Sequence, residues 1–194
     1  MNRFSIEVDK EDLKKAKAAF RNLEAKAPQK LKNAINRTLT QAKNMVLDGE
    51  KEAYTMKPSR FKSDIQTIRA KPGNLSAWIK SKGRPPSVQS YKHGYTKKQG
   101  GKVQVLRANK YGPVGPAGRR GFMLPGGKAA GMMAVRAGRT RKPLNVLHGP
   151  SIPNIVKMVY TGQRGSQGNL QPKVQERLAR EIEKEIEKLT ASKG

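Results

Sequence analysis

The sequence predicts an α+β fold. An N-terminal strand and two helices, the second of them long, pack on a small, mostly antiparallel β-sheet, followed by a Gly/Pro-rich basic loop and a C-terminal amphipathic helix. Three observations favour this architecture: helical spacing of apolar residues near both ends, short alternating runs in the middle, and clusters of Gly and Pro between those runs. The length of 194 residues favours one domain, 1–194.

The N-terminal region has the strongest periodicity. Apolar and polar residues alternate over 4–8, which predicts a strand, and Asp9 is a candidate N-cap for a helix that starts near Lys10. A longer helix is predicted from about Pro28 to Ala53. Its apolar stripe comprises Leu31, Ala34, Ile35, Leu39, Ala42, Met45 and Val46. We interpret the lysines and arginine on its other face as solvated, namely Lys30, Lys32, Arg37 and Lys43.

The middle of the chain changes to a β pattern. Short runs at 65–70, 75–81, 88–93 and 102–108, with another at 132–135, predict the strands of a meander that lies with one face against the long helix. The loop at about 111–131 is rich in Gly and Pro, so we expect it to be exposed, mobile and without regular structure.

A second clear helix is predicted at the C-terminus. Val174, Leu178, Ile182, Ile186 and Leu189 recur at helical spacing, which indicates an amphipathic helical arm over about 171–190. The acids of this helix, as in a Glu181–Lys184 pair, are interpreted as surface groups. The pattern leaves open whether the arm packs on the body or on another subunit.

Charge is distributed unevenly along the chain. Between Ala53 and Gln175 there are 24 Lys and Arg residues and one acidic residue, Asp64, a formal net charge of +23 out of +27. The other 13 acids lie before or after this block. A block of this density repels itself, and this favours a polyanion or an acidic protein surface as its partner.

The residue types argue against catalysis. The chain has no Cys and two histidines, His93 and His148, so thiolate metal sites are excluded and imidazole sites are disfavoured. Metal-dependent nucleases need convergent carboxylates, and the basic block offers one acid. We therefore expect no enzyme activity, no metal and no cofactor. No window approaches the roughly 18 apolar residues of a membrane span, so no membrane association is expected.

Several cations in and after the predicted loop are candidates for contacts with DNA or with an acidic partner. They are Arg119, Arg120, Lys128, Arg136, Arg139, Arg141 and Lys142. Their composition suits neutralisation of phosphates and offers no pattern for reading a base sequence. An acidic protein neighbour in an assembly remains an equal alternative.

The most specific string runs from Lys142 to Pro153. Its sequence predicts an extended segment, a Gly-Pro turn and a helix that Ser151 caps with its hydroxyl while Pro153 occupies the first turn. The string resembles the "PI..LYGPS[IV]P" signature of the phage minor tail protein Z family, the tail completion proteins, with His148 where that family usually has Tyr. The matching residues are Pro143, Leu144, Gly149, Pro150, Ser151, Ile152 and Pro153. Residues 34–38, Ala-Ile-Asn-Arg-Thr, are similar to the family's "ALNRT".

This resemblance implies a noncatalytic structural virion protein that completes the head-proximal end of a long tail and supports head–tail joining. The implied partners are the tail terminator, the tail tube protein and the head–tail connector proteins, with the genomic DNA end close by. A homo-oligomeric ring in the virion neck, assembled in the host cytoplasm, is expected. Two alternatives remain: a nonspecific nucleic-acid-binding protein of ribosomal or nucleoid type, and an enzyme such as a nuclease.

Overall fold

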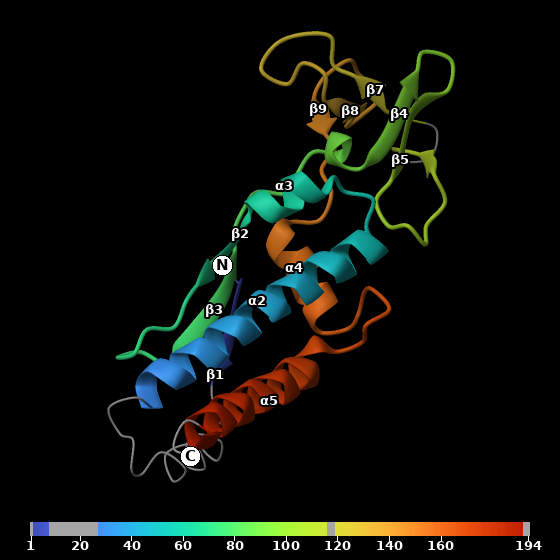
Figure 1. Ribbon diagram of the computed structural model, residues 1–194. Helices are drawn as coiled ribbons and strands as arrows, with labels where there is room; N and C mark the ends of the chain where they lie inside the picture. The colour runs from blue at the N-terminus through green and yellow to red at the C-terminus, as the bar shows by residue number, and fades with distance from the viewer. Residues whose placement is uncertain (1, 8–26, 116–118, 192–194) are drawn as a thin grey trace.

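The protein is elongated, with a helical body at one end and a β-rich lobe at the other (Figure 1). The computed structural model describes residues 2–7, 27–115 and 119–191. Helices and small antiparallel sheets make up the fold, so the predicted α+β class is confirmed. The helix expected to start near Lys10 lies outside the described residues.

The body is built around helix α2, Ala27–Ala53, which confirms the long helix of the sequence prediction. Its apolar stripe is buried, including Leu31, Ile35 and Leu39. A three-stranded antiparallel sheet packs along it, in the order β1 (Asn2–Glu7), β3 (Ser76–Ser81) and β2 (Ile65–Ile68). Side chains of β3 alternate, and every second one is buried, as expected for a sheet with one covered face. Helices α3 (Pro58–Ser63) and α4 (Ile152–Tyr160) complete this part of the body.

The lobe, residues 88–146, contains two further three-stranded antiparallel sheets. The first joins β4 (Lys92–Thr96), β5 (Gly100–Gln104) and β6 (Gly112–Pro113). The second joins β7 (Phe122–Met123), β8 (Met133–Arg136) and β9 (Leu144–Val146). The prediction of one meander against the long helix was therefore wrong, because the strands divide among three sheets. The run at 88–93 also differs, since it begins as a 3₁₀ turn, η1 (Val88–Ser90).

Strands β6 and β7 lie inside the range 111–131 that was expected to lack structure. Glycines in this range and in β5 permit close packing. A Cβ on Gly121 would come 2.6 Å from Val114, and one on Gly101 would come 2.5 Å from the Met133 sulfur. Gly101 donates to the Gly121 carbonyl at 2.8 Å, and Gly121 donates to the Val114 carbonyl at 3.0 Å. The missing side chains thus let three segments approach one another.

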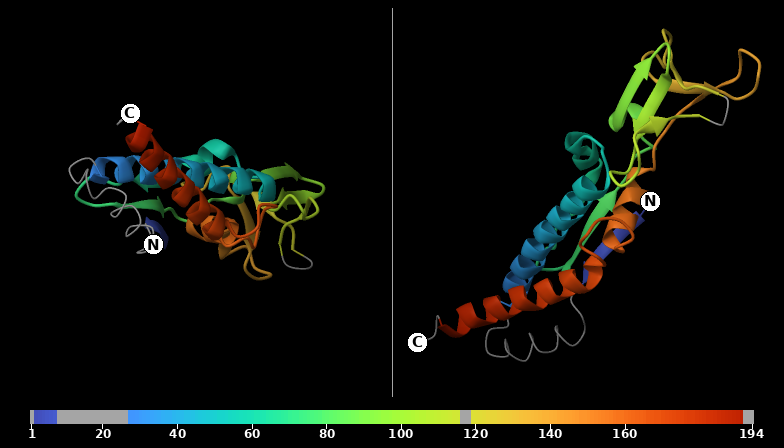
Figure 2. Two further views of the ribbon diagram at one scale, coloured as in Figure 1. Left: turned by 60° about the horizontal axis from the view of Figure 1, so that its bottom comes forward. Right: turned by 90° about the vertical axis from the view of Figure 1, so that its right-hand side faces the viewer.

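Helix α5, Leu170–Ala191, lies against α2 and is no free arm (Figures 1 and 2). Val174, Leu178 and Ile182 are buried as the periodicity predicts. Two acids on the same helix, Glu181 and Glu185, are buried as well, which corrects their interpretation as surface groups. The sequence did not predict which element packs against this helix. In the structure that element is α2.

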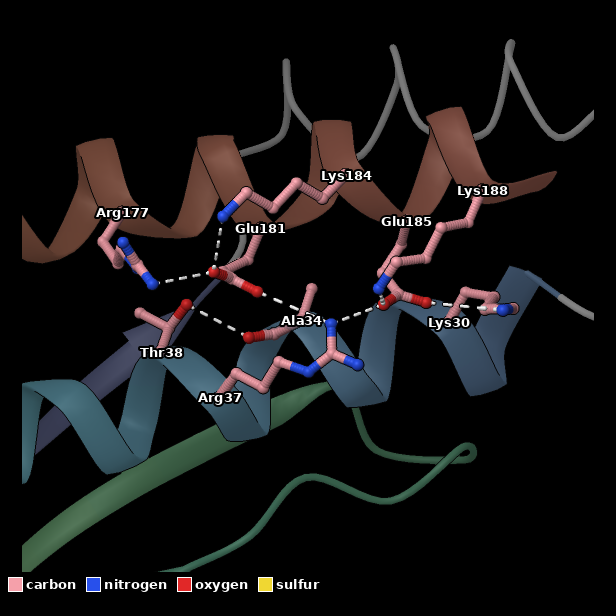
Figure 3. Close-up of polar contacts among 9 residues, drawn as sticks. All are labelled: Lys30, Ala34, Arg37, Thr38, Arg177, Glu181, Lys184, Glu185 and Lys188. Atoms are coloured by element: carbon pink, nitrogen blue, oxygen red, sulfur yellow. Dashed lines mark hydrogen bonds and ion pairs between the residues drawn. The ribbon is translucent and has the colours of Figure 1, made fainter. Parts of the chain in front are cut away.

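The buried acids are held by cations from both helices (Figure 3). Glu185 pairs with Arg37 and lies 3.5 Å from the Lys30 ammonium, so two α2 cations interpreted as solvated contact α5 instead. Glu181 pairs with Arg177 at 3.0 Å and lies 3.6 Å from Arg37. Burial acts to raise the pKa of Glu185, but the hydrogen bonds from Arg37 and Lys188 outweigh it, and the pKa is lowered. The ionised carboxylate is therefore part of the α2–α5 contact.

We expect Glu185→Gln to lower the free energy of unfolding by about 1–3 kcal/mol at pH 7, because it leaves Arg37 and Lys30 without their buried partner. Since folding lowers the pKa of Glu185 from its ordinary value of 4.5, its contribution is present above that value and is lost as pH falls through the folded pKa. The difference between wild type and variant should therefore shrink towards pH 3 in urea titrations. Glu183→Gln, at an exposed position of the same helix, is the control, within about 0.5 kcal/mol of wild type. Equal losses in both variants would contradict this role.

Candidate polyanion-binding site

The lobe has to fold without any acidic residue. It carries 13 Lys and Arg residues and no Asp or Glu, and no acid occurs anywhere between Asp64 and Glu176. Asp64 itself pairs with Arg60 at 2.8 Å, on the body. The positive charge of the lobe is therefore not neutralised by carboxylates of its own segment, and this part of the surface is a strong electrostatic site.

Arg119 and Arg120 join three segments of the lobe. The Arg120 guanidinium donates to the Lys98 carbonyl at 2.7 Å, in the turn between β4 and β5. The Arg119 guanidinium donates to the carbonyl of Ala137, just after β8, and reaches that of Arg136 at 3.4 Å. These bonds place the basic residues of all three segments next to one another. We call this set the basic ridge: Lys97, Lys98, Arg119, Arg120, Arg136, Arg139, Arg141 and Lys142.

The ridge contains six of the seven cations singled out in the sequence. The seventh, Lys128, lies in the connection that precedes β8, whereas residues 137–142 follow the opposite end of that strand. Lys97 and Lys98 were missed as contact residues. Their signal was a Lys-Lys pair in the tight connection between two strands, Thr96 to Gly100, where side chains project into solvent.

Cations of the lobe fall into two groups. One group is held by uncharged partners: Arg107 donates to the Lys51 carbonyl at 2.8 Å, Arg136 lies over the Phe122 ring at 5.8 Å and Lys92 over the Tyr111 ring at 5.5 Å. Arg119, Arg120 and Lys102 belong to the same group, the last because its ammonium donates to Gln99 Oε1 at 2.9 Å. In the second group the exposed side chains have no hydrogen bond or ion pair within the described part of the chain: Lys97, Lys98, Lys110, Lys128, Arg139, Arg141 and Lys142.

The motif of the tail completion resemblance links lobe and body. Pro143 and Leu144 enter β9 of the lobe, while Ile152 is buried in the first turn of α4. Ser151 is the N-cap residue of α4, but its side chain makes no capping bond, which corrects that part of the prediction. Its carbonyl accepts from the Ile155 amide at 3.0 Å, and Pro153 lies in the first turn as expected.

Gly149 is the tightest point of this link. A Cβ at Gly149 would lie 2.3 Å from the ring of Tyr91, whose side chain is 2% exposed. The Gly149 amide donates to the Pro86 carbonyl at 2.8 Å, and the Tyr91 hydroxyl donates to the Pro150 carbonyl at 3.3 Å. Gly149 therefore allows the segment between β9 and α4 to lie close to the buried tyrosine.

A buried carboxyl lies at the same junction. Glu50, in the last turns of α2, is 1% exposed, and its Oε1 atom has no hydrogen-bond partner in the described part of the chain. Burial raises the pKa of Glu50 to about 7, against a smaller opposing effect of Arg107. Burial also raises the pKa of Tyr54 and of Tyr91, and the charge of Glu50 adds to both shifts. Burial thus brings the pKa of Glu50 close to neutral pH.

The remaining polar groups show ordinary local contacts. The Nδ1 atoms of His93 and His148 lie 2.9 Å and 3.0 Å from the carbonyls of Tyr91 and Val146, two residues earlier in each case. Among the described residues there is no group of three or more His, Cys, Asp and Glu placed to hold a metal. No helix in the described ranges is long and apolar enough to cross a bilayer.

Comparison with protein-family models, with curated proteins and with solved structures found no match. The resemblance to tail completion proteins therefore depends on the residues of this chain alone.

We expect Gly149→Ala to lower the free energy of unfolding by about 2–3 kcal/mol, because the added methyl group overlaps the buried Tyr91 ring. Gly126→Ala is the matched control, since nothing lies within 4 Å of a Cβ built there. It should stay within about 0.5 kcal/mol of wild type. Chemical denaturation of both variants measures the difference, and equal stability of the two would show that the tight approach is not required.

The raised pKa of Glu50 predicts a loss of stability as pH rises from about 4.5 to about 7. Folding raises its pKa from 4.5 to about 7, so the folded state binds more protons between these values and the free energy of unfolding falls as pH rises through that window. The loss is on the order of 2–3 kcal/mol. Glu50→Gln should remove this slope while keeping the shape of the side chain. An unchanged slope between pH 4.5 and 8 in the variant would exclude Glu50 as its source.

Proposed function

We propose that this chain is a noncatalytic structural component of a long-tailed phage, which completes the head-proximal end of the tail and supports head–tail joining. The observation that carries the proposal is the position of the motif. Residues 143–153 run from β9 of the lobe into α4 of the body, and Gly149 packs on Tyr91 at the point between them. The residues that resemble the family signature thus form the connection between the basic lobe and the helical body.

A basic lobe without carboxylates suits an assembly contact. Helix α5 carries five Lys or Arg and five Glu, so its formal charge is zero, whereas the lobe carries 13 positive charges. Copies arranged in a ring would present many such lobes towards acidic surfaces of the connector or tube, and towards the DNA end. Long-range Coulomb attraction would speed docking of these parts. We propose the ring and its contacts with the connector and the tube together with this role.

The second candidate is a nucleic-acid-binding protein that acts outside a virion. The basic ridge itself favours it, because eight cations gathered without any carboxylate suit phosphate neutralisation. This candidate does not account for the motif at the junction. The two candidates differ in where the protein is found, and that difference can be measured.

The test is removal of the gene from the phage that encodes the chain. We expect tails of normal length that fail to join heads, and a loss of infectious particles that is restored by the wild-type chain supplied in trans. Labelled wild-type chain should be found at the head-proximal end of complete tails. Infectious yield that does not change, with the chain absent from purified particles, would exclude the structural role and leave the second candidate.

A further inference from the structure

We infer that the basic ridge binds the sugar-phosphate backbone of duplex DNA without reading its sequence. This inference deepens the proposed function, since it names the polyanion that the lobe contacts, and it rests on that function only for its biological setting. Its chemistry depends on the ridge alone. Purified protein can therefore support or overturn it whether or not the chain belongs to a tail.

The ridge combines fixed and free cations. Arg119 and Arg120 use their guanidinium groups on the carbonyls of Ala137 and Lys98, which fixes the two turns relative to each other. The Ala137 amide also donates to the Pro143 carbonyl at 3.0 Å and closes the loop at its base. Five exposed cations are thereby held on two tied turns with their charged ends unpaired in the described structure: Lys97, Lys98, Arg139, Arg141 and Lys142.

The surroundings of the ridge favour DNA over an acidic protein. Protein interfaces usually have an apolar or aromatic centre, whereas interfaces with DNA are polar and strongly positive. The large apolar side chains exposed in the described residues are Ile68, Tyr95, Tyr111 and Leu144. Ile68 belongs to the body, and Lys92 lies over Tyr111. Tyr95 and Leu144 remain as single residues beside the ridge and form no apolar centre.

Side-chain chemistry argues against reading of bases. Specific recognition of adenine commonly uses Asn or Gln amides, and recognition of guanine uses Arg presented into the major groove by a helix or ribbon. Here Gln99 accepts from Lys102 at 2.9 Å, and the Gln104 amide donates to the carbonyls of Arg107 and Asn109. The side chains of these two glutamines are thus bonded within the lobe. The free cations lie on turns, which suits contacts to phosphates.

The number of free cations sets the expected salt dependence. Each phosphate neutralised on duplex DNA contributes about −0.9 to the slope of log K against log salt concentration, so five contacts give a slope of about −4.5. Affinity should then fall on the order of 500-fold between 50 and 200 mM salt. Duplexes of different sequence should bind within about twofold of one another.

The experiment measures binding of the full chain to a fluorescent duplex of mixed sequence over a range of salt concentrations. The ridge variant replaces the five free cations, Lys97, Lys98, Arg139, Arg141 and Lys142, with Gln. The control variant removes the same net charge from the body, at Lys32, Lys43, Lys51, Lys62 and Lys71, also with Gln. Poly-glutamate is the probe for the alternative, an acidic protein surface.

We expect the ridge variant to bind at least 100-fold more weakly than wild type at 50 mM salt, with a slope near zero, and the control variant to bind within about threefold of wild type. Equal losses in both variants would show that only net charge matters and would overturn the inference. Tighter binding of poly-glutamate than of duplex at the same salt would assign the ridge to an acidic protein instead. A slope or affinity that changes with duplex sequence would contradict backbone binding.

Folding of the ridge variant is checked by circular dichroism and thermal denaturation. Two smaller variants, Lys97→Gln with Lys98→Gln and Arg139→Gln with Arg141→Gln, keep the inference testable if the fivefold variant does not fold. Each should reduce the magnitude of the salt slope by about 2. Unchanged slopes in both pairs would overturn the inference. Loss of DNA binding by a variant that still enters tails would separate this inference from the structural role.

Discussion

The absence of carboxylates between Asp64 and Glu176 is the constraint on which the architecture of the lobe depends. Ion pairs with acids of the same segment are impossible there, so the cations that shape the lobe use uncharged acceptors. Arg107, Arg119 and Arg120 donate to backbone carbonyls, and Arg136 and Lys92 lie over aromatic rings. A guanidinium satisfied in this way ties two segments together and keeps its positive charge.

The body, in contrast to the lobe, contains carboxylates, and some of them are buried. Three of its described acids are buried, Glu50, Glu181 and Glu185. The last two are surrounded by cations from α2 and α5. Removal of one partner from such a cluster would leave a charge in a poorly solvated place. Carboxylates therefore contribute to packing in the body, whereas the lobe has 13 Lys and Arg residues and no carboxylate. The body and the lobe lie at opposite ends of the molecule (Figure 1). Both have a net positive charge, but cations of the body are mixed with acids and those of the lobe are not.

Periodic features could be predicted from the sequence. Helix α2 and most of α5 follow from the spacing of apolar residues, because long stripes on one face have few alternative structures. Glu181 and Glu185 lie three and seven positions after Leu178, on the same face of the helix, so the helical spacing indicated that they are buried. Their charge had favoured the interpretation as surface groups. Features that depend on contacts between distant segments had no such signal. From the sequence, Gly101 and Gly121 could not be distinguished from glycines of a turn. A glycine required by the close approach of two segments has no sequence signature of its own. The bonds from Arg119 and Arg120 join segments 17 to 22 residues apart and could not be derived from any short pattern.

If the free cations of the basic ridge form one binding surface for DNA, hydrogen–deuterium exchange of the full chain with and without duplex DNA should detect it directly. We expect slower exchange in the three tied segments, 97–100, 119–121 and 136–142, and unchanged exchange along α2 and α5. Protection centred on the helices of the body, or on the segment around Lys128 without these three, would contradict it.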